Sequence, residues 1–247
     1  MSEIQSLARG LKILDILGQS PEGASITELA EFLLIDKASA SRLASTLASY
    51  GYVEKDATSR RIHLGPQVVN LSRSVLARLP LRAAAKPYLH KLVEATGECA
   101  HLAVLAKDKV LYIDQEESPA TLRVNAQVGT MNPLHCTALG KVLLAFGETA
   151  LPQALESHTA HTITSKKVLK KHLDEVRQAG YAIDDEEFDL DVRCIAVPVT
   201  DFRGKVIGSI GISGPSSRLS LEKLPPLAAR VVEIGKELSE RMTFTRP

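Results

Sequence analysis

The stretch from Asp36 to Leu64, DKASASRLASTLASYGYVEKDATSRRIHL, decides the fold of the first third of the chain. Asp36 is a good helix-capping residue, and apolar residues at helical spacing predict a helix from there to about Tyr50. We expect the buried side of this helix to consist of Leu43, Leu47 and Tyr50. Gly51 ends the helix, and residues 52–64 predict two short strands around a polar turn at residues 56–59.

Two further helices are expected before this stretch. Leucines at helical spacing would form the buried side of the first helix: Leu7, Leu11, Leu14 and Leu17. Thr27 can cap a second helix, which would bury Leu29, Ala30 and Leu33. Two helices joined by a tight turn and followed by a hairpin form a winged helix-turn-helix, whose second helix enters the major groove of DNA.

The exposed side of that second helix carries small hydroxyl residues and two cations, which suit phosphates and base edges. These candidate DNA-binding residues are Lys37, Ser39, Ser41, Arg42 and Ser45. The hairpin adds Arg60 and Arg61, which would contact the DNA backbone. Taken alone, the helix could equally be a solvated surface. The ordered set of helices and basic hairpin favours double-stranded DNA, read as a palindromic operator with one helix per protomer.

Composition limits the other possibilities. The chain has 247 residues, 45% hydrophobic and 24% charged, with a net charge of +1, so any DNA contact must be a small local patch. No apolar run approaches the ~18 residues of a membrane helix, and the N-terminus lacks the pattern of a signal peptide. Three scattered cysteines without C-x-x-C predict neither disulfides nor a zinc site. We therefore expect a cytoplasmic protein with no metal, cofactor or membrane partner.

The chain is expected to fall into three parts. Residues 1–65 form the winged helix-turn-helix, residues 66–80 a linker helix, and residues 81–247 an α+β domain. The linker helix can be a packed core helix, a segment that carries dimer contacts and transmits a signal, or both at once. Strands are expected at residues 99–106, 110–116, 121–126, 192–200 and 205–213. Helices are expected at residues 137–146 and 166–178, and a last one from about Ser220.

Two motifs make the C-terminal part distinctive: PLHCTALGK at residues 133–141 and GYAIDDEEFDLDVRCIAVPVTD at residues 180–201. With ISGP at residues 212–215, Arg218 and the N-terminal pattern, they resemble the isocitrate lyase regulator (IclR) family over nearly the whole chain. One position departs from the family pattern, since Thr200 stands where an aromatic residue or His is usual. The resemblance implies a winged helix, a linker helix and a ligand-sensing domain of GAF-like fold.

The resemblance also implies a transcriptional regulator that forms homodimers, often paired into tetramers. Members mostly repress metabolic operons, some activate them, and their effectors are usually small organic acids or aromatic metabolites. On the family pattern, the effector-binding positions carry over to Ala138, Leu139, Asp184, Cys194, Gly211 and Ser213.

The chemistry of these positions narrows the ligand. Ala138 and Leu139 would offer backbone N–H groups at a helix N-terminus, which suits a carboxylate. Asp184 would accept from a hydroxyl group or share a proton with an acid, and Cys194 and Ser213 would be weak polar contacts. Since no Arg falls on these positions, a carboxylate beside an ionised Asp184 would be repelled, and a neutral or hydroxylated ligand is favoured. Gly211, where some relatives have a hydroxyl residue, would remove one donor and add space.

Other interpretations stay open at this point. Asp184 could be a surface turn carboxylate, and Cys136 and Cys194 could be small buried hydrophobic residues. A small-molecule enzyme would use Cys194 with a distant His. A metal site of His101, His135 and Asp184 has no supporting spacing. A protein-interaction module is a further alternative, but the whole pattern favours a ligand-responsive regulator that is not an enzyme.

Overall fold

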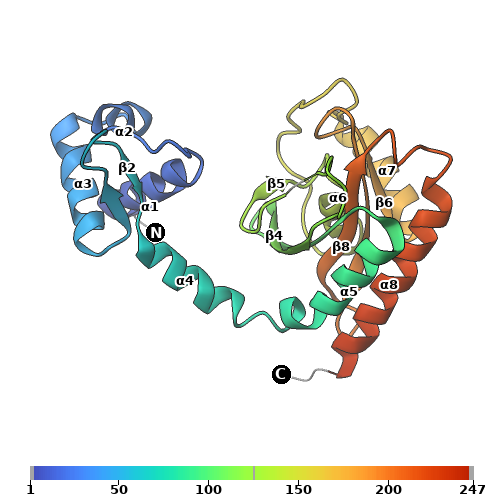
Figure 1. Ribbon diagram of the computed structural model, residues 1–247. Coiled ribbons are helices and arrows are strands. Elements are labelled where there is room, and N and C mark those ends of the chain that lie inside the picture. Colours follow the sequence, from blue (N-terminus) through green and yellow to red (C-terminus); the bar gives the residue numbers. More distant parts are fainter. Residues whose placement is uncertain (1–2, 125, 245–247) are drawn as a thin grey trace. The chain divides into compact units, whose positions relative to one another are not determined.

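The computed structural model describes residues 3–124 and 126–244 (Figure 1). The chain falls into two units, Met1–Arg78 and Leu79–Pro247. The predicted division into three parts with boundaries at residues 65 and 80 stays a prediction.

The first unit contains a helix-turn-helix and a two-stranded hairpin. Its elements are α1 (Gln5–Gly18), α2 (Ile26–Leu33), α3 (Lys37–Ser49), β1 (Val53–Lys55), β2 (Ile62–Leu64) and α4 (Pro66–Leu76). The strands of the hairpin are antiparallel, with Val53 opposite Leu64. Ile13 and Leu29 are among the fully buried residues that hold the three helices and the hairpin around one core.

Capping fixes where the paired helices begin. Ser25, not Thr27 as predicted, caps α2, because its side chain accepts the N–H of Glu28 while the Glu28 carboxylate accepts the N–H of Ser25. This reciprocal pair satisfies two backbone donors at once. Asp36 caps α3 as predicted, since its Oδ1 accepts the N–H of Ser39 at 2.8 Å. The turn between the helices is therefore set by two local side-chain caps.

Three predicted core positions are wrong. Leu7 and Leu11 are 59% and 55% exposed, and Tyr50 is 72% exposed. In α1 the buried stripe is instead Gly10, Ile13 and Leu17. The predicted leucines do have helical spacing, but most of them lie on the side of α1 next to the one that is buried. In α3 the buried residues are Ala40 and Ala44, whose small side chains suit close packing of this helix.

The second unit is an α+β domain with one six-stranded antiparallel sheet. The sheet order is β5-β4-β3-β8-β7-β6. Its strands are β3 (Cys99–Ala106), β4 (Lys109–Glu116), β5 (Met131–Pro133), β6 (Ala182–Asp185), β7 (Val192–Thr200) and β8 (Val206–Pro215). Helices α5 (Pro80–Thr96) and α8 (Leu224–Phe244) pack together on one face, and α6 (Ala138–Phe146) and α7 (Lys166–Ala179) pack together against the other (Figure 1).

Two predicted elements of this unit need correction. The described residues of 121–126 form no strand, because β5 occupies the place beside β4, with Leu111 opposite Met131. The last helix begins at Leu224 rather than near Ser220. The two prolines that follow Leu224 explain this start, since proline is tolerated in the first turn of a helix and disrupts its interior.

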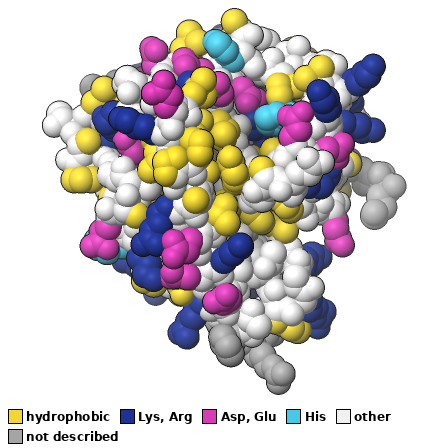
Figure 2. Space-filling model, turned by 90° about the vertical axis from the view of Figure 1, so that its right-hand side faces the viewer, with side chains coloured by type: hydrophobic (Ala, Val, Ile, Leu, Met, Phe, Trp, Pro, Cys, Tyr) yellow, Lys and Arg dark blue, Asp and Glu magenta, His cyan; other side chains and the backbone are white. Residues whose placement is uncertain are grey.

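Charges of both signs are mixed on the face that Figure 2 shows. Figure 2 shows hydrophobic side chains gathered in the middle of one face, with basic and acidic side chains around them. This mixture agrees with the net charge of +1 and restricts any nucleic-acid contact to a local patch. Among the described residues, no helix is both long and apolar enough to cross a membrane.

Candidate DNA-binding face and ligand cavity

The exposed side of α3 presents the predicted polar residues together. Lys37, Ser41, Arg42 and Ser45 are exposed, and Ser39 is half-buried. The Arg42 guanidinium donates to Ser39 Oγ at 3.2 Å, which holds the side chain along the first turn of the helix. Hydrogen bonds from Ser39 lower the pKa of Asp36, so the cap remains ionised. The helix therefore offers one oriented cation beside several hydroxyl groups.

The two arginines of the hairpin have different surroundings. Arg60 is exposed, and its φ of 58° lies in the left-handed region. Arg61 instead donates to the carbonyls of Glu22 and Gly23 at 2.8 and 2.9 Å, and pairs with Glu28 at 3.0 Å. Arg61 thus ties the hairpin to the start of α2. Its predicted DNA contact stays a prediction, and Arg60 is the arginine whose side chain is available.

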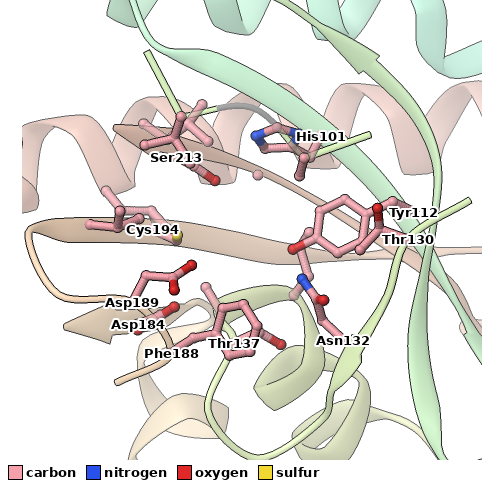
Figure 3. A pocket seen from close by; sticks show the side chains of 18 of the residues that line it. His101, Tyr112, Thr130, Asn132, Thr137, Asp184, Phe188, Asp189, Cys194 and Ser213 are labelled. Atoms are coloured by element: carbon pink, nitrogen blue, oxygen red, sulfur yellow. The ribbon is translucent and has the colours of Figure 1, made fainter. Parts of the chain in front are cut away.

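A cavity of about 340 Å³ lies in the second unit, between the sheet and the start of α6 (Figure 3). Its size is at the lower end of the range for small-molecule pockets. All six positions predicted to bind an effector line this one cavity: Ala138, Leu139, Asp184, Cys194, Gly211 and Ser213. Residues from the start of α6 and from three strands thus meet at one place, and their role towards a ligand stays a prediction.

The N-terminus of α6 opens towards the cavity with free donors. Thr137 caps the helix: its Oγ1 accepts the N–H of Gly140 at 3.2 Å and donates to the Pro133 carbonyl at 2.8 Å. The N–H groups of Ala138 and Leu139 have no hydrogen-bond partner within the described chain. A Cβ at Gly140 would lie 2.4 Å from the Leu134 carbonyl oxygen, so only glycine lets the loop approach the helix this closely.

Three of the polar residues form a row across the sheet. Asp184 on β6 lies opposite Cys194 on β7, which lies opposite Ser213 on β8. Asp184 is buried, and its Oδ1 accepts the N–H of Glu187 at 2.8 Å. Burial raises the pKa of Asp184 to about 7, although the nearby Lys141 ammonium opposes this shift. Asp184 is therefore not a surface turn carboxylate, and it can hold a proton near neutral pH.

A buried ion pair lies next to this row. Lys141 on α6 is fully buried and pairs with the carboxylate of Glu187. The Lys141 ammonium also lies 3.2 Å from Nε2 of His172. Burial and this ammonium lower the pKa of His172 to about 4, so the imidazole is neutral. Since Glu187 donates its N–H to Asp184, a single hydrogen bond links the ion pair to the cavity wall.

Comparison with known proteins decides the family. The protein-family model of the C-terminal domain of IclR bacterial transcriptional regulators matches residues 73–240. The protein-family model of the IclR helix-turn-helix domain matches residues 6–57. The chain belongs to the IclR family. It is a helix-turn-helix transcriptional regulator, as the sequence motifs predicted, and the winged-helix and α+β fold classes are confirmed with it.

Relatives of this IclR-family regulator match over almost the whole chain. The HTH-type transcriptional regulator BhcR of Paracoccus denitrificans is 35% identical, over 96% of this chain and 86% of that protein. The regulator KdgR of Escherichia coli is 34% identical, over 98% and 94%. The structure of an IclR transcriptional regulator from Alicyclobacillus acidocaldarius superimposes with a TM-score of 0.81 at 27% identity, over 97% and 99%. The relatives are thus transcriptional regulators.

The cysteines of this IclR-family chain are protonated. Burial and the nearby Asp184 carboxyl raise the pKa of the Cys194 thiol well above its ordinary value. Burial, again with Asp184, raises the pKa of Cys136 to about 12. Because the thiolate is the reactive form, the raised pKa values make the buried Cys136 and the half-buried Cys194 weak nucleophiles.

Gly211 does not add space to the cavity as expected. A Cβ at this position would lie 2.2 Å from the Ile195 carbonyl oxygen and 2.9 Å from the Cβ of Ala196. Ala196 is the direct partner of Gly211 on β7. The glycine therefore allows the close approach of two strands, and the room its missing side chain would leave is already filled by β7.

Several lining residues were missed by the sequence reasoning. They come from strands and loops outside the two motifs, or were not assigned a ligand role: His101, Tyr112, Thr130, Asn132, Thr137 and Phe188. His101 was weighed only as a metal ligand with His135, whose Nε2 lies 2.9 Å from the Glu156 carbonyl outside the cavity. His101 lies opposite Gly211 in the β3–β8 pairing, and this pairing is the signal that could have identified His101 as a lining residue.

Proposed function

We propose that this regulator represses a metabolic operon and that a small molecule in the C-terminal cavity controls its affinity for DNA. The observation that carries the proposal is the meeting of all six predicted effector positions around one cavity, in a chain whose other unit is a helix-turn-helix. An effector acts by binding one arrangement of the regulator better than another, which shifts the population between them.

On the DNA side, α3 enters the major groove. Arg42 is the main specific contact, because its guanidinium is exposed and already oriented by Ser39. Lys37, Ser39, Ser41 and Ser45 contact phosphates or base edges, and Arg60 contacts the backbone at the hairpin. A protein that binds chromosomal DNA in this way acts in the bacterial cytoplasm.

A palindromic operator requires two copies of α3, and the first unit supports a homodimer. Ile4, at the start of α1, leaves an exposed apolar stripe with Leu7 and Leu11, and Val69 and Val75 leave another on α4. Such stripes are costly in water and are typical of protein–protein contacts. A second copy of the chain would cover them, and these homodimers could pair again into tetramers. An exposed stripe on α4 also favours the dimer-contact interpretation of the linker helix.

The effector is a small molecule that meets the free N–H groups of Ala138 and Leu139 and the carboxyl of Asp184. The family resemblance points to a small organic acid or an aromatic metabolite. The raised pKa of Cys194 supports a binding role for the cavity rather than an enzyme that uses a cysteine nucleophile.

Fluorescence anisotropy on DNA upstream of the regulator's own gene tests the proposal, with excess nonspecific competitor and a randomised operator pool as a second source of sites. Saturable binding that survives competitor is expected. Arg42→Ala should weaken it by roughly 1–3 kcal/mol, the usual worth of a specific base contact. Arg203→Ala, an exposed arginine of the second unit, is the matched control.

Asp184→Ala separates the two sites. This variant should bind DNA as the wild type does and lose the response to any metabolite that releases wild-type protein from DNA. An unchanged response would remove Asp184 from the effector site. Failure of the wild type to select any sequence from the pool would overturn the DNA-binding proposal itself.

A further inference from the structure

His101 is the most unusual polar residue of the cavity. Its side chain is buried, and neither ring nitrogen has a hydrogen-bond partner within the described residues. Its ring meets Tyr112 edge-on, with centroids 5.7 Å apart, which leaves the nitrogens unsatisfied. Buried polar groups without a partner are rare in folded proteins, and at the wall of a cavity they indicate a group that a ligand satisfies.

The imidazole is neutral under physiological conditions. Burial lowers the pKa of His101 to about 4, so near neutral pH one nitrogen carries a proton and the other accepts. A hydroxyl group can serve either nitrogen, because it both donates and accepts a hydrogen bond. A neutral imidazole provides no positive charge to attract a carboxylate.

Apart from the N–H groups at the start of α6, which can donate to an anion or to a hydroxyl group, the remaining walls also favour hydroxyl groups. Figure 3 shows His101 and Ser213 on one side of the cavity and Asp184 on the opposite side. Asp189 adds a second carboxyl, and no Lys or Arg occurs among the described lining residues. Lys141, a buried cation whose charge acts on Asp184, is paired with Glu187 and does not line the cavity. Carboxyl oxygens need donors, which hydroxyl groups supply and carboxylates do not.

The volume limits the size of the ligand. At about 30 Å³ for each water-sized group, 340 Å³ holds about 11 non-hydrogen atoms. A linear compound of five or six carbons with a hydroxyl group on each carbon is of this size.

We propose that the effector is an uncharged polyhydroxylated compound of five or six carbons, and that His101 determines its specificity by hydrogen bonding one of its hydroxyl groups. Further hydroxyl groups donate to Asp184 across the cavity and accept from the free N–H groups of α6. This inference rests on the proposed function, since it specifies the ligand of the same cavity.

Calorimetry and thermal shift on the full chain at pH 7.5 test it with two matched pairs of probes. Xylitol and sorbitol are the uncharged probes, and xylonate and gluconate are the acids of the same length. We expect the polyols to bind and raise the Tm, and the acids to bind at least tenfold more weakly. His101→Phe, which keeps a ring of similar size, should weaken polyol binding at least tenfold, and His101→Gln should retain part of it.

Ser209→Ala is the control for altering a buried unpartnered group on the same sheet. Its hydroxyl also lacks a partner within the described residues, but Ser209 does not line the cavity, so polyol affinity should stay within twofold of the wild type. If His101→Phe lowers the Tm of the free protein by more than the control does, binding is compared below both transitions. The polyol affinity of His101→Gln then gives a second test of the role of His101 that does not depend on the phenylalanine variant.

Three outcomes would overturn the inference. The first is that the acids bind as tightly as the polyols. The second is that the His101→Phe variant binds polyols as the wild type does, and the third is that none of the four probes binds. Anisotropy on operator DNA separates these from failure of the proposed function. Specific DNA binding without polyol binding would reject the ligand class alone, whereas absence of specific DNA binding would reject the regulator proposal whether or not a polyol binds.

Discussion

The DNA-binding face is drawn from one short stretch of chain, residues 36–61, whereas the cavity is lined by residues from His101 to Ser213. The first face keeps its cations in water, where Lys37, Arg42 and Arg60 are exposed. The second surrounds its ligand site with buried titratable groups. A surface site therefore depends little on the core that carries it, while the cavity and the stability of its domain depend on the same residues.

The largest expected change in stability comes from removing Lys141, the buried cation beside the cavity. Lys141→Met leaves the Glu187 carboxylate buried without its partner, which costs about 3–5 kcal/mol. Urea unfolding should show this loss, and hydrogen exchange should place it in the second unit. Lys171→Met, on the exposed side of α7, should stay within about 0.5 kcal/mol.

The pair can also be removed as a whole. Lys141→Met combined with Glu187→Leu should recover much of the lost stability, because no uncompensated charge remains. A loss below about 1 kcal/mol in the single variant would mean that water reaches Glu187 and that the site is not dry.

The next largest effect depends on pH. Asp184 has a pKa of about 7 in the folded protein, raised by burial from an ordinary value of 3.8. Between these values the folded state holds a proton that the unfolded chain has released. The contribution of Asp184 to stability is therefore fully present below about pH 4 and is lost as the pH rises to 7.

Asp184→Asn removes this penalty, because the amide is neutral at every pH and its oxygen can still accept from Glu187. Relative to the wild type, the variant should gain about 2–4 kcal/mol between pH 4 and pH 8. Unfolding free energies at the two pH values measure the gain. A flat difference for Asp184→Asn would show that its carboxyl is hydrated.

The two hairpin arginines allow a surface contact and a structural contact to be compared within the first unit. Arg60→Ala should leave stability unchanged and reduce the salt slope of DNA binding by about one, as expected for the loss of one phosphate contact. Arg61→Ala should instead destabilise the first unit by roughly 1 kcal/mol, through its lost hydrogen bonds to Glu22 and Gly23. Anisotropy at several salt concentrations and thermal unfolding separate the two. Equal salt slopes would make Arg61 a DNA contact as well.

Local signals allowed much of the fold to be predicted. Asp36 caps α3 as expected, and the bounds predicted for β3 and β7, residues 99–106 and 192–200, are those of the structure. Alternation and capping act over a few residues, so a single sequence contains them. The predicted core of α1 was wrong because several sides of an amphipathic helix satisfy the same spacing. The packing of α1 against α2, α3 and β2 selects Ile13 over Leu11.

The cavity could be predicted only in part. Six of its residues were found because the family pattern assigns them a ligand role, whereas His101 and Tyr112 belong to a β-hairpin outside that pattern. The pairing of β3 with β8, which joins His101 to Gly211 about a hundred positions away, brings this hairpin to the cavity, and Tyr112 follows on β4 beside β3. Gly211 shows the same limit, since the need for glycine comes from the backbone of β7.

The smallest expected effect concerns the turn that orients α3. Leu34 ends α2 with a φ of 54°, in the left-handed region that costs a non-glycine residue about 1 kcal/mol or more. Its side chain is 91% exposed, so it contributes almost no burial. Leu34→Gly should therefore stabilise the first unit by about 0.5–1 kcal/mol.

Thermal unfolding measures this gain, which should raise the Tm by a few degrees in a unit of this size, and DNA affinity should not change. Leu34→Ala is the matched control, because it removes the exposed side chain but keeps the Cβ that makes the left-handed conformation costly. A gain in the glycine variant alone would locate the strain in the backbone of the turn. Equal gains in both would trace it to the exposed leucine, and the turn would then be set by the caps of Ser25 and Asp36 without stored strain.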